Sequence, residues 1–316
     1  MRKLTVAILG NHSVSYCTER ELDWTFENMG HEVLRFQENT ARTEAIAAQC
    51  ASRKADLFIY VNTHGWKTPG SIPFGEMVQR IKSAGAVTCG FHLDIYWGLN
   101  TTDHRQDEIG KHPLWKMDYM FTADGGHDAE FKARGVNHHW LPPAVVARDC
   151  KRGNFRQDFA TDVVFVGART YHPEYPFRGQ LVDWLGKTYG PRFRRYGGGT
   201  PWPAIREESL NDLYASAKVC VGDSCFAGTP KYWSDRVPET LGRGGFLIHP
   251  QVEGLDIPGL VTFEPGNLGQ LKEKIDYYLA HDSERRAKAN QAFEWVLENE
   301  TYTNRVQKML EIMGLQ

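Results

Sequence analysis

The chain has 316 residues, of which 41% are hydrophobic and 24% are charged. These proportions are typical of a folded globular protein and exclude a disordered or fibrous chain. The length favours two domains of about 150 residues each, because single hydrophobic cores stop growing at about 250–300 residues. Lys and Arg total 37 against 39 Asp and Glu, which gives a formal net charge of −2. That balance excludes a uniformly basic surface, so a nucleic-acid partner would have to be met by a local patch.

The apolar segments are too short for a membrane span or a secretory leader. No apolar run reaches the roughly 18 residues that a membrane-spanning helix needs, and the apolar start of the chain ends at Leu9. The six cysteines form no C-x-x-C pair, and their spacing fits neither a zinc site nor a disulfide framework. Cys89 and Cys220 lie in apolar runs and are expected to be core thiols. We therefore expect a reducing, cytoplasmic location.

Short β-rich runs alternate with helical patterns along the first half, which predicts parallel sheets layered with helices. The expected strands are Leu4–Gly10, Glu32–Phe36, Asp56–Val61, Ala86–His92, Tyr119–Thr122 and Asn137–Leu141. The expected helices are Thr18–Met29, Thr40–Arg53 and Phe74–Ala84. Thr18 and Glu21 have the spacing of a capping box at the start of the first helix, and Gly30 provides a left-handed end.

A second α/β segment follows the polar and basic stretch Pro142–Gln157, which has the composition of an interdomain linker. The expected strands there are Asp162–Gly167, Phe193–Tyr196, Lys218–Gly222, Gly245–His249 and Leu260–Phe263. The expected helices are Tyr175–Tyr189, Ile205–Ala215, Asp235–Arg243, Leu268–His281, Ser283–Glu298 and Thr301–Met313. We expect a Rossmann-like domain over residues 1–150, a second over 151–298, and a C-terminal helix over 299–316 that packs back on the first domain.

Ligands of such domains bind at the carboxyl ends of the strands, so the loops there are the candidate sites. The loop after the first strand, GNHSVS, lacks the G-x-G-x-x-G pattern of NAD-binding proteins. Later loops hold His64, His92 and Asp94, of which Asp94 is the favoured general base, with His92 and His64 as alternatives. A turn cap for Asp94 and a core position for His92 are the structural interpretations. Tyr96 and Trp97 fit either a stacking surface for a ligand or the core.

An anion site is indicated by the segment KYWSDRVPETLGRGGFLIHP, which begins at Lys231. A helix is expected to start there with Ser234 or Asp235 as its N-cap, and the backbone N–H groups of a helix start attract anions. Lys231 and Arg236 add positive charge that suits a diphosphate. Glu239 shares a helix face with Arg236 and can accept hydrogen bonds from ribose hydroxyls. The competing interpretation is an ordinary amphipathic helix with an Arg236–Glu239 surface pair.

The same segment resembles the donor-binding motif of GT-B glycosyltransferases, in particular the family 4-like and CgeB-like groups. Their pattern S-x-R-x-x-E-x-x-x-x-G is filled here by Ser234, Arg236, Glu239 and Gly244 or Gly245. The stretches Leu213–Asp223 and Asp118–Pro142 fit the layout of the same family. The resemblance implies an α/β fold of the GT-B type, in which two Rossmann-like domains face each other across a cleft. The N-terminal domain would bind the acceptor and the C-terminal domain the nucleotide-sugar donor.

The resemblance also implies donor contacts after the first two strands of the second domain. Gly167 would let the donor phosphates approach the backbone, and Arg169 would add charge. Gly197 lies in RRYGGGT, where the family rests the nucleobase against the backbone. A plain strand-end glycine and a simple turn are the competing interpretations. Lys231 stands where many family 4 enzymes have a second Glu, so it is expected to hold a phosphate.

The activity that the resemblance implies is a hexosyl- or pentosyltransferase that uses a nucleoside-diphosphate sugar. A UDP-sugar is the expected donor, no cofactor is expected, and Lys231 and Arg236 would take the place of a metal. The acceptor is open among a glycan, a small molecule and a modified DNA base, since some phage GT-B enzymes of this size act on hydroxymethylated DNA bases. A nucleotide-dependent oxidoreductase or epimerase is one alternative, opposed by the missing G-x-G-x-x-G. A non-catalytic two-domain binder is another, opposed by the missing signal peptide.

Overall fold

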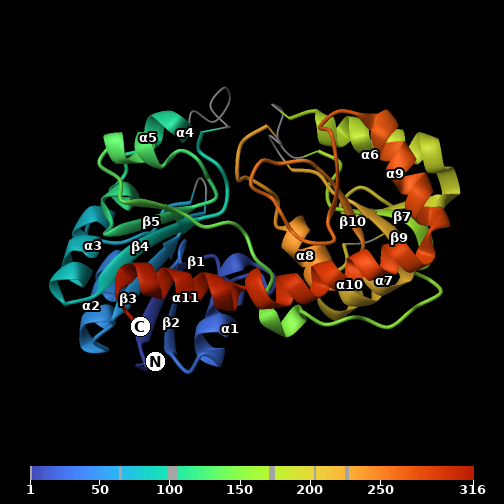
Figure 1. The fold of residues 1–316 in the computed structure, drawn as a ribbon. Coiled ribbons are helices and arrows are strands. Elements are labelled where there is room, and N and C mark those ends of the chain that lie inside the picture. The colour runs from blue at the N-terminus through green and yellow to red at the C-terminus, as the bar shows by residue number, and fades with distance from the viewer. Residues whose placement is uncertain (1, 64–65, 98–104, 171–174, 203, 225–227) are drawn as a thin grey trace. The chain divides into compact units, whose positions relative to one another are not determined.

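The computed structural model describes residues 2–63, 66–97, 105–170, 175–202, 204–224 and 228–316. These residues form two parallel sheets, each covered by helices (Figure 1). This is the α/β architecture that the alternating strand and helix patterns predict, because parallel strands need crossover connections that place helices on the sheet faces.

The first sheet has six strands in the order β2-β1-β3-β4-β5-β6, all parallel. The strands are β1 Thr5–Gly10, β2 Glu32–Gln37, β3 Leu57–Val61, β4 Val87–His92, β5 Tyr119–Thr122 and β6 His138–Trp140. The α-helices around it are α1 Thr18–Asn28, α2 Thr43–Ser52, α3 Phe74–Ser83, α4 Arg105–Glu108, α5 Asp128–Ala133 and α11 Tyr302–Met313. Every residue of β3 is buried, as expected for a central strand covered on both faces.

The second sheet has five parallel strands in the order β11-β10-β9-β7-β8. The strands are β7 Thr161–Val166, β8 Phe193–Tyr196, β9 Ala217–Val221, β10 Leu247–Pro250 and β11 Val261–Phe263. The α-helices are α6 Phe177–Tyr189, α7 Glu207–Ser216, α8 Arg236–Gly242, α9 Leu268–Ala280 and α10 Asp282–Asn299. The chain continues from β7 to β8 on one side and returns to β9 on the other. The carboxyl ends of β7 and β9 therefore form the switch point at which doubly wound sheets bind ligands.

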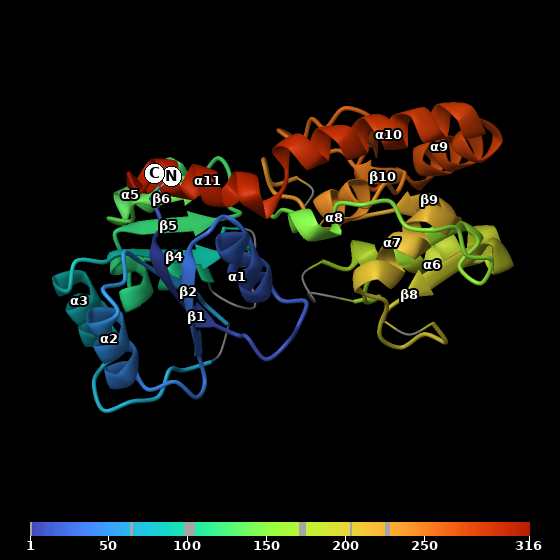
Figure 2. The same cartoon turned by 90° about the horizontal axis from the view of Figure 1, so that it is seen from below.

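The chain divides into two compact units, Met1–Pro142 with Tyr302–Gln316, and Pro143–Thr301. The expected boundary at residue 150 differs from this division because residues 143–150 pack on the second unit. Val145 forms a short parallel bridge with Thr301, and Asp149 forms an ion pair with Arg243. Helix α11 belongs to the first unit, where it packs against α1 (Figure 2).

Of the two predictions made for the ends of α1, the glycine at its C-terminal end is confirmed and the capping box at its start is wrong. Gly30 adopts a φ of 91°, the left-handed conformation expected after a helix. The capping box at Thr18 is wrong, because Cys17 occupies the N-cap position and no side chain caps the helix there. The acidic side chain that matters at this helix start is Glu19, whose carboxylate accepts a hydrogen bond from the Asn11 N–H at 2.8 Å. The start of α1 is therefore tied to the loop after β1.

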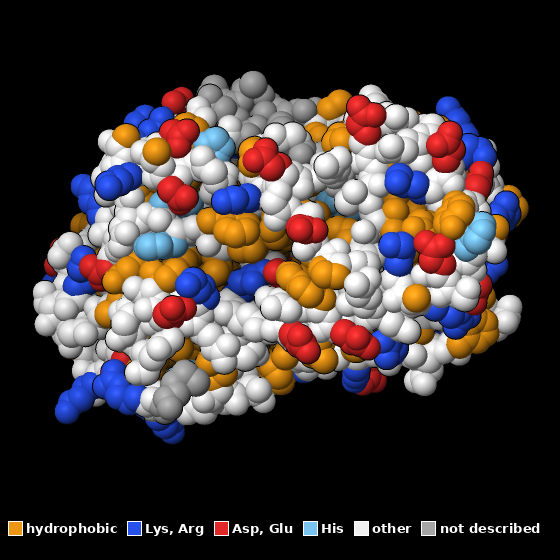
Figure 3. Space-filling model, in the orientation of Figure 1, with side chains coloured by type: hydrophobic (Ala, Val, Ile, Leu, Met, Phe, Trp, Pro, Cys, Tyr) orange, Lys and Arg blue, Asp and Glu red, His pale blue; other side chains and the backbone are white. Residues whose placement is uncertain are grey.

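The burial of two cysteines and the distribution of surface charge agree with what the sequence predicts. Cys89 and Cys220 are buried core thiols, as expected. Among the residues that the structure describes, Cys17, Cys50, Cys89, Cys150 and Cys220 are free thiols. On the face drawn in Figure 3, basic and acidic side chains are interspersed, in keeping with the small net charge. No helix within the described ranges has both the length and the apolar character to cross a bilayer.

Candidate active site

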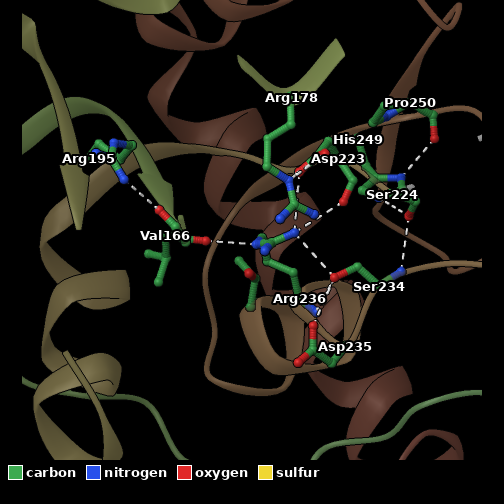
Figure 4. Close-up of polar contacts among 12 residues, drawn as sticks. Val166, Arg178, Arg195, Asp223, Ser224, Ser234, Asp235, Arg236, His249 and Pro250 are labelled. Carbon is green, nitrogen blue, oxygen red and sulfur yellow. Dashed lines mark hydrogen bonds and ion pairs between the residues drawn. The ribbon is translucent and has the colours of Figure 1, made fainter. Parts of the chain in front are cut away.

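Arg236 is the first residue of α8, and its guanidinium reaches the end of β7 (Figure 4). Its Nε donates to the carbonyl oxygen of Val166 at 2.7 Å. Its Nη1 donates to the carbonyl oxygen of Asp223 at 3.1 Å and to Ser234 Oγ at 3.2 Å. The side chain is only 14% exposed. These bonds fix the guanidinium at the switch point of the second sheet.

Asp223 lies just after β9, is fully buried, and joins two arginines. The Nε of Arg178 donates to both carboxylate oxygens of Asp223, at 3.1 and 2.8 Å. Arg236 approaches the same carboxylate with its Nη1 at 3.3 Å. Two guanidinium groups thus share one carboxylate. Guanidinium groups held at a switch point suit an anionic ligand, because their N–H donors match the oxygens of phosphates and carboxylates.

Gly167 leaves the outer edge of the Arg236 guanidinium open. A Cβ at Gly167 would lie 2.9 Å from Nη2 of Arg236, and the φ of 143° at this position is one that side chains rarely adopt. Within the described ranges, Nη2 of Arg236 donates no hydrogen bond, so it remains available to a ligand. The glycine thus fits the predicted close approach of a ligand to the backbone.

Gly197, which follows β8, packs directly on Gly167. A Cβ at Gly197 would lie 2.5 Å from the carbonyl oxygen of Gly167. Arg195 holds the two loops together, because its Nη1 donates to the carbonyl oxygens of Gly167 and Gly198 at 3.0 and 3.1 Å. This contact between two backbones accounts for Gly197 without a ligand and makes its loop part of the wall beside Gly167.

A buried hydrogen-bond chain fixes the start of α8. The Nδ1 of His249 contacts the carbonyl oxygen of Pro250 at 2.7 Å, so it must carry the proton. Its Nε2 therefore accepts from Ser224 Oγ at 3.0 Å, and Ser224 Oγ accepts from the Ser234 N–H at 3.0 Å. Burial lowers the pKa of His249 to about 4, so this histidine is neutral near pH 7.

Glu239 lies one turn beyond Arg236, and the Arg236–Glu239 surface pair of the competing interpretation does not form. Arg236 pairs with Asp223 instead. Glu239 accepts a hydrogen bond at Oε2 from the Nε of Arg243 at 2.7 Å. Its side chain is 18% exposed, which leaves part of the carboxylate accessible. Burial raises the pKa of Glu239 above its usual value.

In the described part of the chain, the hydrogen bonds made by Lys231 and Arg169 lead to residues outside the cluster around Arg236. The backbone N–H of Lys231 donates to the carbonyl oxygen of Glu253 at 2.7 Å, and its side chain passes over Gly254. Arg169 follows the β7 loop but turns toward α6, where its Nε donates to Asp183 at 2.8 Å. The second cation of the cluster is therefore Arg178, which the sequence analysis missed.

In the first unit, β4 ends at His92, so Asp94 lies in the loop beyond it, and strand alternation does not set its direction. The Asp94 carboxylate is 33% exposed and lies 3.3 Å from Nη1 of the buried Arg105. His92 is only 8% exposed and packs its ring 5.1 Å from that of Tyr96. His64 lies outside the described residues. Of the two candidates for the base that the structure describes, Asp94 is more exposed to solvent than His92.

Asp124 holds the backbone of the same loop in place. The sequence did not single it out. It is fully buried, and its Oδ1 accepts from the backbone N–H groups of Tyr96 and Trp97 at 2.7 and 3.0 Å. Burial raises its pKa to about 6. Tyr96 is 4% exposed and belongs to the hydrophobic core with Trp97 packed against it, so these aromatics are core residues. Asp124 and Asp223 share one signal in the sequence, an acidic residue two positions beyond a buried strand.

Comparison with known proteins shows a similarity over part of the chain. Residues 178–311 match the model of a family described as glycosyl transferase-like. The matched segment begins at Arg178 and contains Asp223, Arg236 and Glu239. No curated protein matches the chain.

Solved structures with the same architecture cover nearly the whole chain. Anabaena HepE in complex with UDP and glucose is 11% identical with a TM-score of 0.65, over 99% of this chain and 100% of that one. An alpha-glucosyltransferase in complex with UDP-glucose and DNA containing an abasic site is 11% identical with a TM-score of 0.67, over the same shares. A putative UDP-N-acetylglucosamine 2-epimerase from Listeria monocytogenes is 9% identical with a TM-score of 0.54, over 99% and 96%. These similarities define an α/β fold of the GT-B type with two Rossmann-like units.

Proposed function

We propose that the chain is a glycosyltransferase that binds a nucleoside-diphosphate sugar in its second unit, with a UDP-sugar as the donor. The observation that carries this proposal is the Arg178–Asp223–Arg236 cluster beside the bare backbone of Gly167. The cluster places two guanidinium groups at the switch point of a doubly wound sheet. Guanidinium groups suit phosphate oxygens, because their N–H donors match that geometry and their charge persists at every working pH.

The comparisons support the same proposal from a different direction. The glycosyl transferase-like match covers all three members of the cluster. The HepE and alpha-glucosyltransferase structures were determined with UDP or UDP-glucose, which makes a uridine nucleotide the first ligand to test here. The proposal includes membership of the CgeB-like group and the transfer of either a hexose or a pentose.

In the proposed mechanism, Arg236 and Arg178 stabilise the charge that develops on the diphosphate as the bond to the sugar breaks. These fixed cations would make a metal unnecessary. Oε1 of Glu239 would accept a hydrogen bond from a ribose hydroxyl. Ser234 contributes indirectly, because its Oγ accepts from Nη1 of Arg236 and holds the guanidinium in place.

On the acceptor side, we propose Asp94 as the base that takes the proton from the acceptor hydroxyl. Its carboxylate is partly exposed, and Nη1 of Arg105 lies 3.3 Å from it. His92 and His64 remain the alternatives. The acceptor class is open among a glycan, a small molecule and a modified DNA base.

A ligand panel tests the proposal. UDP, GDP, ADP and NAD are each added to the full chain, and the shift in melting temperature is measured. Stabilisation by a nucleoside diphosphate and not by NAD supports the transferase, and a response to NAD alone contradicts it. Mass spectrometry of products from mixed UDP-sugars and acceptors then identifies the transferred sugar.

A 2-epimerase acting on a UDP-sugar is the second candidate, because a putative UDP-N-acetylglucosamine 2-epimerase shares this fold. An epimerase changes the sugar without an acceptor. Incubation of the chain with UDP-N-acetylglucosamine alone, followed by separation of the epimers, distinguishes the two activities.

A further inference from the structure

We infer that Arg243 is a positioning residue for the Glu239 carboxylate and that Asp149 holds Arg243 in place. The inference rests on the proposed donor site, in which Glu239 accepts a hydrogen bond from a ribose hydroxyl. It adds two residues to those that recognise the donor, and one of them, Asp149, lies near the start of the second unit.

Each nitrogen of the Arg243 guanidinium is committed to a different partner. Nε donates to Glu239 Oε2 at 2.7 Å, and Nη2 donates to Asp149 Oδ2 at 2.7 Å. Nη1 donates to the carbonyl oxygen of Glu207 at 3.2 Å and to Asn211 Oδ1. The side chain is 4% exposed. A planar group held on three sides has a single orientation, which it passes on to the carboxylate it binds.

The hydrogen bond to Oε2 leaves the other oxygen of Glu239 for a ligand. Within the described ranges, Oε1 accepts no hydrogen bond, and the side chain keeps its 18% exposure. Burial raises the pKa of Glu239, and the charge of Arg243 opposes that rise. Without Arg243 the carboxyl would be free to rotate and easier to protonate. A protonated carboxyl is a poorer acceptor for a hydroxyl.

Asp149 connects this arrangement to the segment that enters the second unit. It ends the short 3₁₀ helix Ala147–Asp149. Asn211 fastens the same segment, because its Nδ2 donates to the carbonyl oxygens of Asp149 and Lys151 at 3.0 and 2.6 Å. The orientation of Glu239 therefore depends on this segment through a continuous chain of buried and half-buried hydrogen bonds.

The test compares UDP with 2′,3′-dideoxy-UDP, which lacks the ribose hydroxyls. Calorimetry measures the affinity of both ligands for the wild type, Glu239→Gln, Arg243→Gln and Asp149→Asn. The wild type is expected to prefer UDP by about tenfold, the value of one hydrogen bond to a charged group. Arg243→Gln is expected to lose that preference as Glu239→Gln does, with dideoxy-UDP bound about as in the wild type. Asp149→Asn, which conserves size, is expected to lose part of it.

Arg286→Gln is the matched control, because Arg286 forms the same i,i+4 type of pair, with Asp282, but is 74% exposed. It is expected to keep the full preference for UDP. If Arg243→Gln and Asp149→Asn weaken the binding of UDP and of dideoxy-UDP equally, Arg243 and Asp149 have a purely structural role and the inference is overturned. An unchanged preference in Asp149→Asn, if Arg243→Gln fails to fold, also overturns it. If the wild type binds neither ligand, the proposed function itself falls.

Discussion

The Nε of Arg236 donates a hydrogen bond to the carbonyl oxygen of Val166 at 2.7 Å, which locks the first side chain of α8 to the last residue of β7. The bond joins segments 70 residues apart. It turns Nη2 toward Gly167, where a side chain would block it. The donor site proposed here depends on that orientation, and it can be tested residue by residue.

Arg236→Lys is expected to weaken UDP binding by about tenfold or more, because Lys keeps the charge but loses the planar set of donors. The buried Asp223 keeps Arg178 as a partner, so the fold is expected to survive. Calorimetry gives the affinity, and circular dichroism checks the fold. Arg286→Lys, at an exposed position of α10, is the control and is expected to bind UDP like the wild type.

Gly167→Ala is expected to abolish most UDP binding, because the added Cβ would lie 2.9 Å from Arg236 Nη2. The substitution also strains the backbone and is expected to cost about 1 kcal/mol or more of folding stability. Gly190→Ala separates the two effects, since Gly190 has a positive φ but open space around its Cβ position. That control is expected to lose stability and keep binding. Equal UDP affinity in the two variants would remove Gly167 from the site.

Asp94→Asn is expected to reduce turnover by at least about a hundredfold, a typical contribution of a general base. UDP affinity is expected to stay within about twofold, because Asp94 lies in the other unit. Initial rates give turnover, and calorimetry gives binding. Turnover within about threefold of the wild type would exclude Asp94 as the base and return attention to His92 and His64.

Acid is expected to destabilise the second unit through His249. Its pKa is about 4 in the folded chain against an ordinary 6.5, so the unfolded state binds more protons between these values. Stability is therefore lost as the pH falls from about 6.5 to 4, by about 2 kcal/mol between pH 7 and 5. Urea unfolding at both pH values measures the effect. In His249→Gln the pH-dependent loss should shrink, even if the variant is less stable at pH 7.

Asp124 is expected to act in the opposite sense in the first unit. Its pKa is about 6 in the folded chain against an ordinary 3.8, so the folded state binds the proton more tightly. Its contribution to stability is present at low pH and is lost as the pH rises through 6, by about 1 kcal/mol between pH 5 and 7. Asp124→Asn retains an oxygen for the two backbone N–H groups and removes the titration. A variant with an unchanged pH dependence would contradict the assigned pKa.

The sequence was sufficient for the layered fold because buried parallel strands have a strong local signature. Strand Phe193–Tyr196, for example, has the expected bounds. Arg236 could be singled out since it follows a predicted helix start. The Arg178–Asp223 pair could not, because 45 residues separate the partners and only the folded sheet brings them together. Arg169 was predicted as a donor contact because it lies two residues beyond Gly167 in the sequence. Its long side chain instead turns toward α6 and bonds Asp183.

The most direct test of the donor site is a crystal structure of the full chain with UDP. The account predicts a diphosphate oxygen within hydrogen-bond distance of Arg236 Nη2, beside the backbone of Gly167, and a ribose hydroxyl on Glu239. A UDP molecule bound elsewhere, with Nη2 of Arg236 still free of phosphate, would contradict it.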